Sequence, residues 1–70
     1  MKSDIQITVN GMKETVPAES RIADLIERFG EKDPDLIVEH NGRFVYPKHY
    51  DSTTVSPGDR VEFINPNFGG

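Results

Sequence analysis

Residues 4–16 read DIQITVNGMKETV, and this stretch predicts how the fold begins. Apolar and polar residues alternate over 5–10, which is the pattern of a strand buried on one face. The Asn10–Gly11 pair then favours a type I′ turn, because both central positions of that turn require positive φ. Residues 12–16 are expected to return as an antiparallel strand, and Pro17 to end it because proline has no backbone N–H. The chain therefore starts with a β-hairpin.

A short amphipathic helix is predicted after the hairpin. Its apolar side chains recur at helical spacing, at Ile22, Leu25, Ile26 and Phe29. We expect Ser20 to cap the first turn and Gly30 to follow the last. Asp24 and Arg28 stand four residues apart and are expected to pair on the solvent face. A helix of about nine or ten residues is too short to be stable alone, so we expect it to pack on a sheet.

The second half of the chain predicts three more strands. Strands are expected at 36–40 and 43–46, around a second Asn–Gly pair, and at 60–64 after an irregular stretch over 47–59. The order β-β-α-β-β-β indicates an α+β domain, with one helix across a mixed sheet of four to five strands. Because the first and last strands both look core-facing, we expect them to lie side by side and parallel in the middle of the sheet.

Composition excludes several classes of function. The chain has 70 residues, a net charge of −4 and no cysteine. We expect no nucleic-acid partner, because binding its phosphates needs a basic surface. No apolar run resembles a signal peptide or a membrane span, so we expect a cytoplasmic protein with no membrane association. One small domain is predicted, with a core that must be stable without disulfides.

No group of side chains predicts an active site or a metal site. His40 and His49 are the two histidines, and neither stands at a recognisable metal-ligand spacing. The hydroxyl residues near His49 lack a nucleophile turn, and the internal glycines stand singly at turns instead of forming a phosphate loop. We therefore expect no metal, no cofactor bound by this chain and no enzymatic activity of its own.

The last residues carry the strongest functional signal. Pro66 cannot continue a strand ladder, so residues 65–70 are expected to leave the domain of residues 1–64 as a flexible arm. Gly69 and Gly70 have no side chains and can be threaded into a narrow channel. The carboxylate of Gly70 can accept a nucleophile once it is activated, for example as a mixed anhydride with AMP. We expect this carboxylate to be the reactive group.

A partner that activates the arm must also recognise the folded body. Alternation along 60–64 places Ile64 on the face that the helix leaves open. Phe68 on the arm, with Phe44 or Tyr46 from the neighbouring hairpin, would join Ile64 in a small apolar docking patch. The alternative is that Ile64 completes the core.

Five segments carry a resemblance to a known family: ITVNG, RIADLIERF, VEHNGRFVYPKHY, PGDRVEFI and the final GG. In order and spacing they resemble the ubiquitin-like β-grasp sulfur carriers, most of all the thiamine-biosynthesis type. The resemblance implies that an E1-like adenylyltransferase, using ATP and magnesium, adenylates the terminal carboxylate. Sulfur from a cysteine desulfurase would convert the adenylate to a thiocarboxylate, and thiazole synthase would receive that sulfur.

The tail leaves two alternatives open. Its segment NPNF, ahead of the glycines, is more reminiscent of the molybdopterin-synthase small subunit, although the short body and VYPKHY favour the thiamine type. A carrier for another sulfur pathway, such as cysteine or methionine synthesis, is a further alternative on this pattern. A ubiquitin-like modifier, or a pure interaction module, is the alternative of another class. A modifier would use the same activated carboxylate to form isopeptide bonds.

Overall fold

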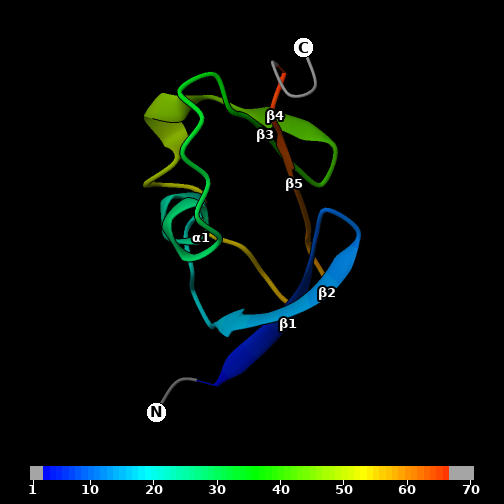
Figure 1. The fold of residues 1–70 in the computed structure, drawn as a ribbon. Helices are drawn as coiled ribbons and strands as arrows, with labels where there is room; N and C mark the ends of the chain where they lie inside the picture. Colours follow the sequence, from blue (N-terminus) through cyan, green and yellow to red (C-terminus); the bar gives the residue numbers. More distant parts are fainter. Residues whose placement is uncertain (1–2, 67–70) are drawn as a thin grey trace.

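The computed structural model describes residues 3–66, in which one helix crosses a curved five-stranded sheet (Figure 1). The elements are β1 Asp4–Val9, β2 Met12–Pro17, α1 Ile22–Arg28, β3 Ile37–His40, β4 Arg43–Val45, the 3₁₀ helix η1 Pro47–His49, and β5 Arg60–Ile64. The predicted order of strands and helix is confirmed. The stretch expected to be irregular contains η1, which begins at a proline whose fixed φ suits a first helical position.

The sheet has the strand order β2-β1-β5-β3-β4. Strands β1 and β5 run parallel, and each of the other neighbouring pairs is antiparallel. The predicted central, parallel pair is therefore confirmed. Although β5 is the middle strand of five, its last residue, Ile64, has a strand partner on one side only: it stands opposite Ile37 of β3, whereas the pairing with β1 ends at Val61.

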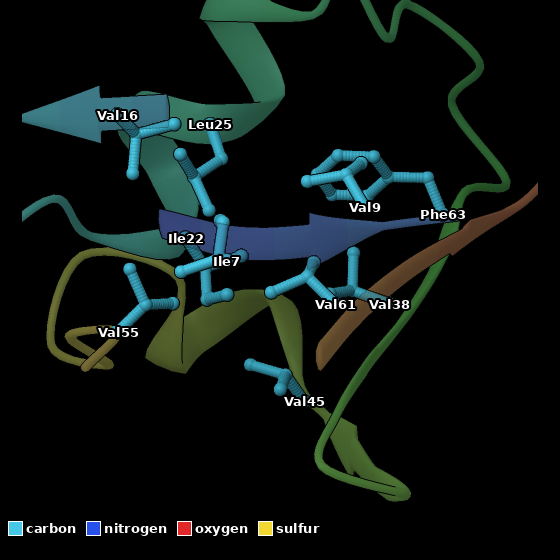
Figure 2. Packing of buried hydrophobic residues seen from close by; sticks show 10 residues of the cluster. All are labelled: Ile7, Val9, Val16, Ile22, Leu25, Val38, Val45, Val55, Val61 and Phe63. Atoms are coloured by element: carbon cyan, nitrogen blue, oxygen red, sulfur yellow. The ribbon is translucent and has the colours of Figure 1, made fainter. Parts of the chain in front are cut away.

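The core lies between one face of this sheet and α1. It consists of Ile7, Val9, Val16, Ile22, Leu25, Val38, Val45, Val55, Val61 and Phe63. Figure 2 shows side chains of the helix and of the strands pointing into this common interior. Val61 is fully buried and Phe63 nearly so, as the alternation in β5 predicts. Within residues 3–66, no α-helix covers the other face of the sheet.

The start of the helix differs from the prediction. Ser20 is not its cap, because the Ser20 hydroxyl donates to the carbonyl of Pro17 at 2.6 Å and the residue is buried. Arg21 is the N-cap, and its backbone N–H donates to the Asp24 carboxylate at 2.9 Å. The helix consequently begins at Ile22 and has seven residues, fewer than expected.

The predicted pairing of Asp24 with Arg28 is also wrong. The guanidinium of Arg21 donates to both carboxylate oxygens of Asp24, each at 3.1 Å. These side-chain hydrogen bonds, and then the backbone one, hold the pKa of Asp24 below its ordinary value. Gly30 does follow the helix with a φ of 70°, as predicted for a residue at that position.

Candidate functional site

The open face of the sheet ends in an apolar row beside the last residue of β5. Ile64 stands directly opposite Ile37 of β3. The β3–β4 register pairs Val38 with Val45, which brings Ile37 beside Tyr46 just after β4. Ile64 is 37% exposed and Tyr46 is 57% exposed. We refer to Ile37, Phe44, Tyr46 and Ile64 together as the open-face patch.

Aromatic rings form the outer part of the open-face patch. Phe44 and Tyr46 meet edge to face, with ring centroids 4.6 Å apart, and Phe44 is 48% exposed. The ring of His49 approaches Tyr46 at 6.4 Å. Large apolar side chains exposed together, instead of singly, are typical of surfaces that bind a partner. The structure thus places Phe44, Tyr46 and Ile64 on exposed surface, while their role in binding stays a prediction.

Three residues of this face were not singled out from the sequence. They are Ile37, Glu39 and Glu62. Glu39 is paired with Glu62 on one side and with Phe44 on the other. Period-two alternation along 37–40 would have placed Ile37 and Glu39 on one face. Only the pairing register, however, brings them opposite β5.

The predicted arm begins immediately after β5. The side-chain amide of Asn65 donates to the Glu31 carboxylate at 3.4 Å, linking the start of the arm to the loop after α1. Phe63, the inward neighbour of Ile64, packs its ring against Phe29 of that same region with centroids 6.5 Å apart. Phe68, Gly69 and Gly70 lie outside the described residues, and the predictions made for them stay predictions.

A polar network occupies the other end of β5, before Arg60. The carboxylate of Asp59 lies 2.7 Å from His40 Nε2, and it accepts hydrogen bonds from the Ser56 backbone N–H at 2.8 Å and from the Asn41 amide at 3.1 Å. Burial by itself would raise the pKa of Asp59. The hydrogen bonds, with that of His40 first, outweigh it and hold the pKa below its ordinary value. Each member of the network therefore has a structural partner.

Two further observations concern residues 3–66. No three histidine, aspartate or glutamate side chains of this part gather as metal ligands would. None of its helices has the length and apolar character needed to cross a membrane. The surface features that stand out in this part of the chain are the open-face patch and the strand end beside it.

A mixed sheet with parallel first and last strands, crossed by one helix, defines the ubiquitin-like β-grasp class. The ThiS family model matches residues 3–70, and the chain belongs to that family. It is similar to the thiamine biosynthesis protein ThiS from Geobacter metallireducens, whose crystal structure gives a TM-score of 0.82 at 32% identity. The match covers 94% of this chain and 100% of that one. No curated protein sequence matches significantly. The family and the fold make this chain a ThiS-type sulfur carrier.

Proposed function

We propose that this chain carries sulfur for thiazole formation in thiamine biosynthesis, and that the terminal carboxylate of Gly70 is the group that bears it. The observation that supports this most directly is the family match, which runs through residue 70 and so includes the predicted arm. The similar ThiS structure, matched over 94% of the chain, supports the same assignment.

The proposed chemistry has three steps. A carboxylate oxygen of Gly70 attacks the α-phosphorus of ATP, and pyrophosphate leaves, which gives an acyl adenylate. The terminal sulfur of a persulfide on the cysteine desulfurase then attacks the carbonyl carbon, and AMP leaves, which gives an acyl disulfide. Two equivalents of a thiol reductant cleave its S–S bond and are oxidised to a disulfide, which leaves the thiocarboxylate on Gly70 and a free thiol on the desulfurase. ATP and magnesium are bound by the activating partner in this scheme. No side chain of this chain takes part, and the protein is a co-substrate and not an enzyme.

Three partners follow from this chemistry. An E1-like adenylyltransferase activates Gly70, a cysteine desulfurase supplies the sulfur, and thiazole synthase accepts it. Gly69 would pass through the narrow entrance to the adenylation site, where a side chain would obstruct it. The open-face patch beside β5, with Phe68, would bind the body of the adenylyltransferase. A cytoplasmic location for these reactions stays a prediction.

Intact-mass spectrometry tests the proposal. The purified chain is incubated with the cognate adenylyltransferase, ATP, magnesium, the desulfurase, cysteine and a thiol reductant. We expect one oxygen to be replaced by one sulfur, and the product to support thiazole formation when thiazole synthase is added. A chain lacking Gly70, or extended by one residue after it, should show no mass change and melt at the wild-type temperature. Covalent conjugates to lysines, without a sulfur-bearing form, would indicate a modifier instead.

A further inference from the structure

Two glutamates face each other at the centre of the open sheet face. Glu39 of β3 and Glu62 of β5 are directly opposite partners in an antiparallel pair. Side chains in such pairs have Cβ atoms about 4.5–5.5 Å apart, and like charges directly opposite each other are destabilising. Within residues 3–66, neither carboxylate forms an ion pair or a hydrogen bond. The fold therefore maintains a repulsive pair without compensating it.

The neighbours of this pair are apolar and exposed. Phe44 stands opposite Glu39 on its other side, and Ile64 follows two residues after Glu62 on the same face. Arg60 precedes Glu62 by two residues on that face, yet it makes no ion pair with either glutamate in the described structure. The two charges thus adjoin the open-face patch, so a protein that covers the patch also covers them.

We propose that Glu39 and Glu62 together accept one basic side chain, an arginine or a lysine, of the partner that docks on the open-face patch. This inference rests on the proposed function, in which that partner is the adenylyltransferase. A guanidinium offers five N–H donors in a planar fork and can bridge two carboxylates, so arginine fits best. The partner's charge removes the repulsion between the glutamates, and the surrounding apolar contact strengthens the interaction by excluding water.

Charge complementarity favours a basic protein partner on this face over a second copy of the chain and over nucleic acid. A second copy of the chain would bring the same two carboxylates to the face, in a protein that already has a net charge of −4. A nucleic acid would bring phosphates, which the glutamates repel. A partner surface that is apolar and carries one basic side chain complements both the open-face patch and the two carboxylates.

The experiment compares Glu39→Gln, Glu62→Gln and the double variant with the wild-type chain. Calorimetry measures binding to the cognate adenylyltransferase at about 0.05 M and about 0.5 M salt, because screening over this range weakens exposed charge pairs. At low salt we expect about tenfold weaker binding in the double variant, as for loss of a well-placed charged contact. Its affinity should also vary less with salt than that of the wild type.

Thermal unfolding supplies the second readout. The double variant should melt at or above the wild-type temperature, because removing like charges relieves repulsion. A merely structural role for the glutamates would instead lower the melting temperature. Glu27→Gln, on the exposed side of α1, is the matched control and should change neither binding nor its salt dependence.

Three results would overturn the inference. One is a double variant that binds with wild-type affinity and salt dependence, while the wild type still acquires sulfur; this leaves the proposed function intact. The second is concentration-dependent self-association of the wild type that Ile64→Ser abolishes, which would assign the face to a second copy. The third is a wild type that neither binds the adenylyltransferase nor gains sulfur, and in that case the proposed function fails as well.

Discussion

The side-chain oxygen of Asn10 accepts a 2.8 Å hydrogen bond from the backbone N–H of Phe63, a residue 53 positions later in the chain. The backbone N–H of Asn10 also donates to the Val61 carbonyl at 3.0 Å. On the other side of β5, the side-chain oxygen of Asn41 accepts from the Arg60 N–H, and the backbone N–H of Asn41 donates to the Arg60 carbonyl, both at 2.8 Å. Both hairpin turns therefore hold the strand that leads to the predicted arm.

Replacing Asn10 by glycine tests this contact without straining the turn. Asn10 has a φ of 51°, which glycine also adopts readily, so Asn10→Gly removes the side-chain hydrogen bond and keeps the backbone conformation. We expect the free energy of unfolding to fall by about 1–2 kcal/mol, because the Phe63 N–H loses its partner in a part-buried position.

Urea unfolding at neutral pH measures that change. Asn41→Gly is the control, since the side-chain hydrogen bonds of Asn41 to Arg60 and to Asp59 are both exposed and water can replace them. The control should lose less stability than Asn10→Gly. Equal losses in the two variants, or none in Asn10→Gly, would show that the bond to Phe63 does not stabilise β5.

The strand order was predictable because each signal was local and consistent with the others. The two Asn–Gly pairs indicated hairpins, and the alternation in β1 and β5 indicated a buried central pair. The helix cap was not predictable in this way. Ser20 is a favourable cap type, but its hydroxyl donates instead to the Pro17 carbonyl three residues earlier. Its own carbonyl accepts from the Val55 N–H, a contact that depends on the tertiary fold. The long-range bond of Asn10 likewise has no local signal, because the turn alone accounts for an asparagine there.

The candidate site was predictable where it depends on alternation and not where it depends on register. Alternation along β5 correctly predicted that Ile64 is exposed and Phe63 buried. The facing of Glu39 and Glu62 requires the alignment of β3 with β5, and a shift of one residue would reverse every side chain. A single sequence fixes that alignment only weakly when the connection between the strands is long.

Acid should destabilise the fold in part through Asp59. Hydrogen bonds hold its folded-state pKa below the unfolded value of about 3.9. A group with a lowered folded pKa contributes stability above its unfolded pKa, and this contribution is lost as the pH falls through the folded pKa. We expect the free energy of unfolding to decline from about pH 5 downward, and less steeply in Asp59→Asn.

Urea unfolding between neutral pH and about pH 3 provides the comparison. The Asp59→Asn variant should be less stable than the wild type at neutral pH, because the charged acceptor for His40, Asn41 and the Ser56 N–H is lost. The difference in the free energy of unfolding between the wild type and Asp59→Asn should become smaller toward low pH. A difference that stays constant with pH would show that the charge of Asp59 contributes nothing.

The docking role of the open-face patch is tested by changing Ile64 and Phe68 to serine. If both residues anchor the adenylyltransferase, the double variant should bind it about 1–3 kcal/mol more weakly. Folding stability should change little, because Ile64 is 37% exposed and is not part of the buried core. Calorimetric binding and thermal unfolding are measured on the same preparation.

Met12→Ser is the control for that experiment. Met12 is a large apolar residue, 66% exposed, in the edge strand β2 and outside the open-face patch. Its replacement should leave the affinity for the adenylyltransferase unchanged. A large drop in melting temperature for the double variant, with unchanged affinity, would mean that Ile64 completes the core and does not bind a partner.

Gly69 is predicted to matter because it has no side chain. Gly69→Val adds a β-branched group that a narrow channel cannot admit and that disfavours positive φ. Because small misplacement of a reacting group can cost about a hundredfold, we expect kcat/KM for adenylation to fall by about that factor. For Gly69→Ala, which adds one methyl group, kcat/KM should lie between the values for the wild type and for Gly69→Val. The melting temperature of both variants should match the wild type, since the change lies beyond β5. Steady-state pyrophosphate release with the cognate adenylyltransferase measures the effect, and wild-type activity in Gly69→Val would exclude threading through a narrow channel.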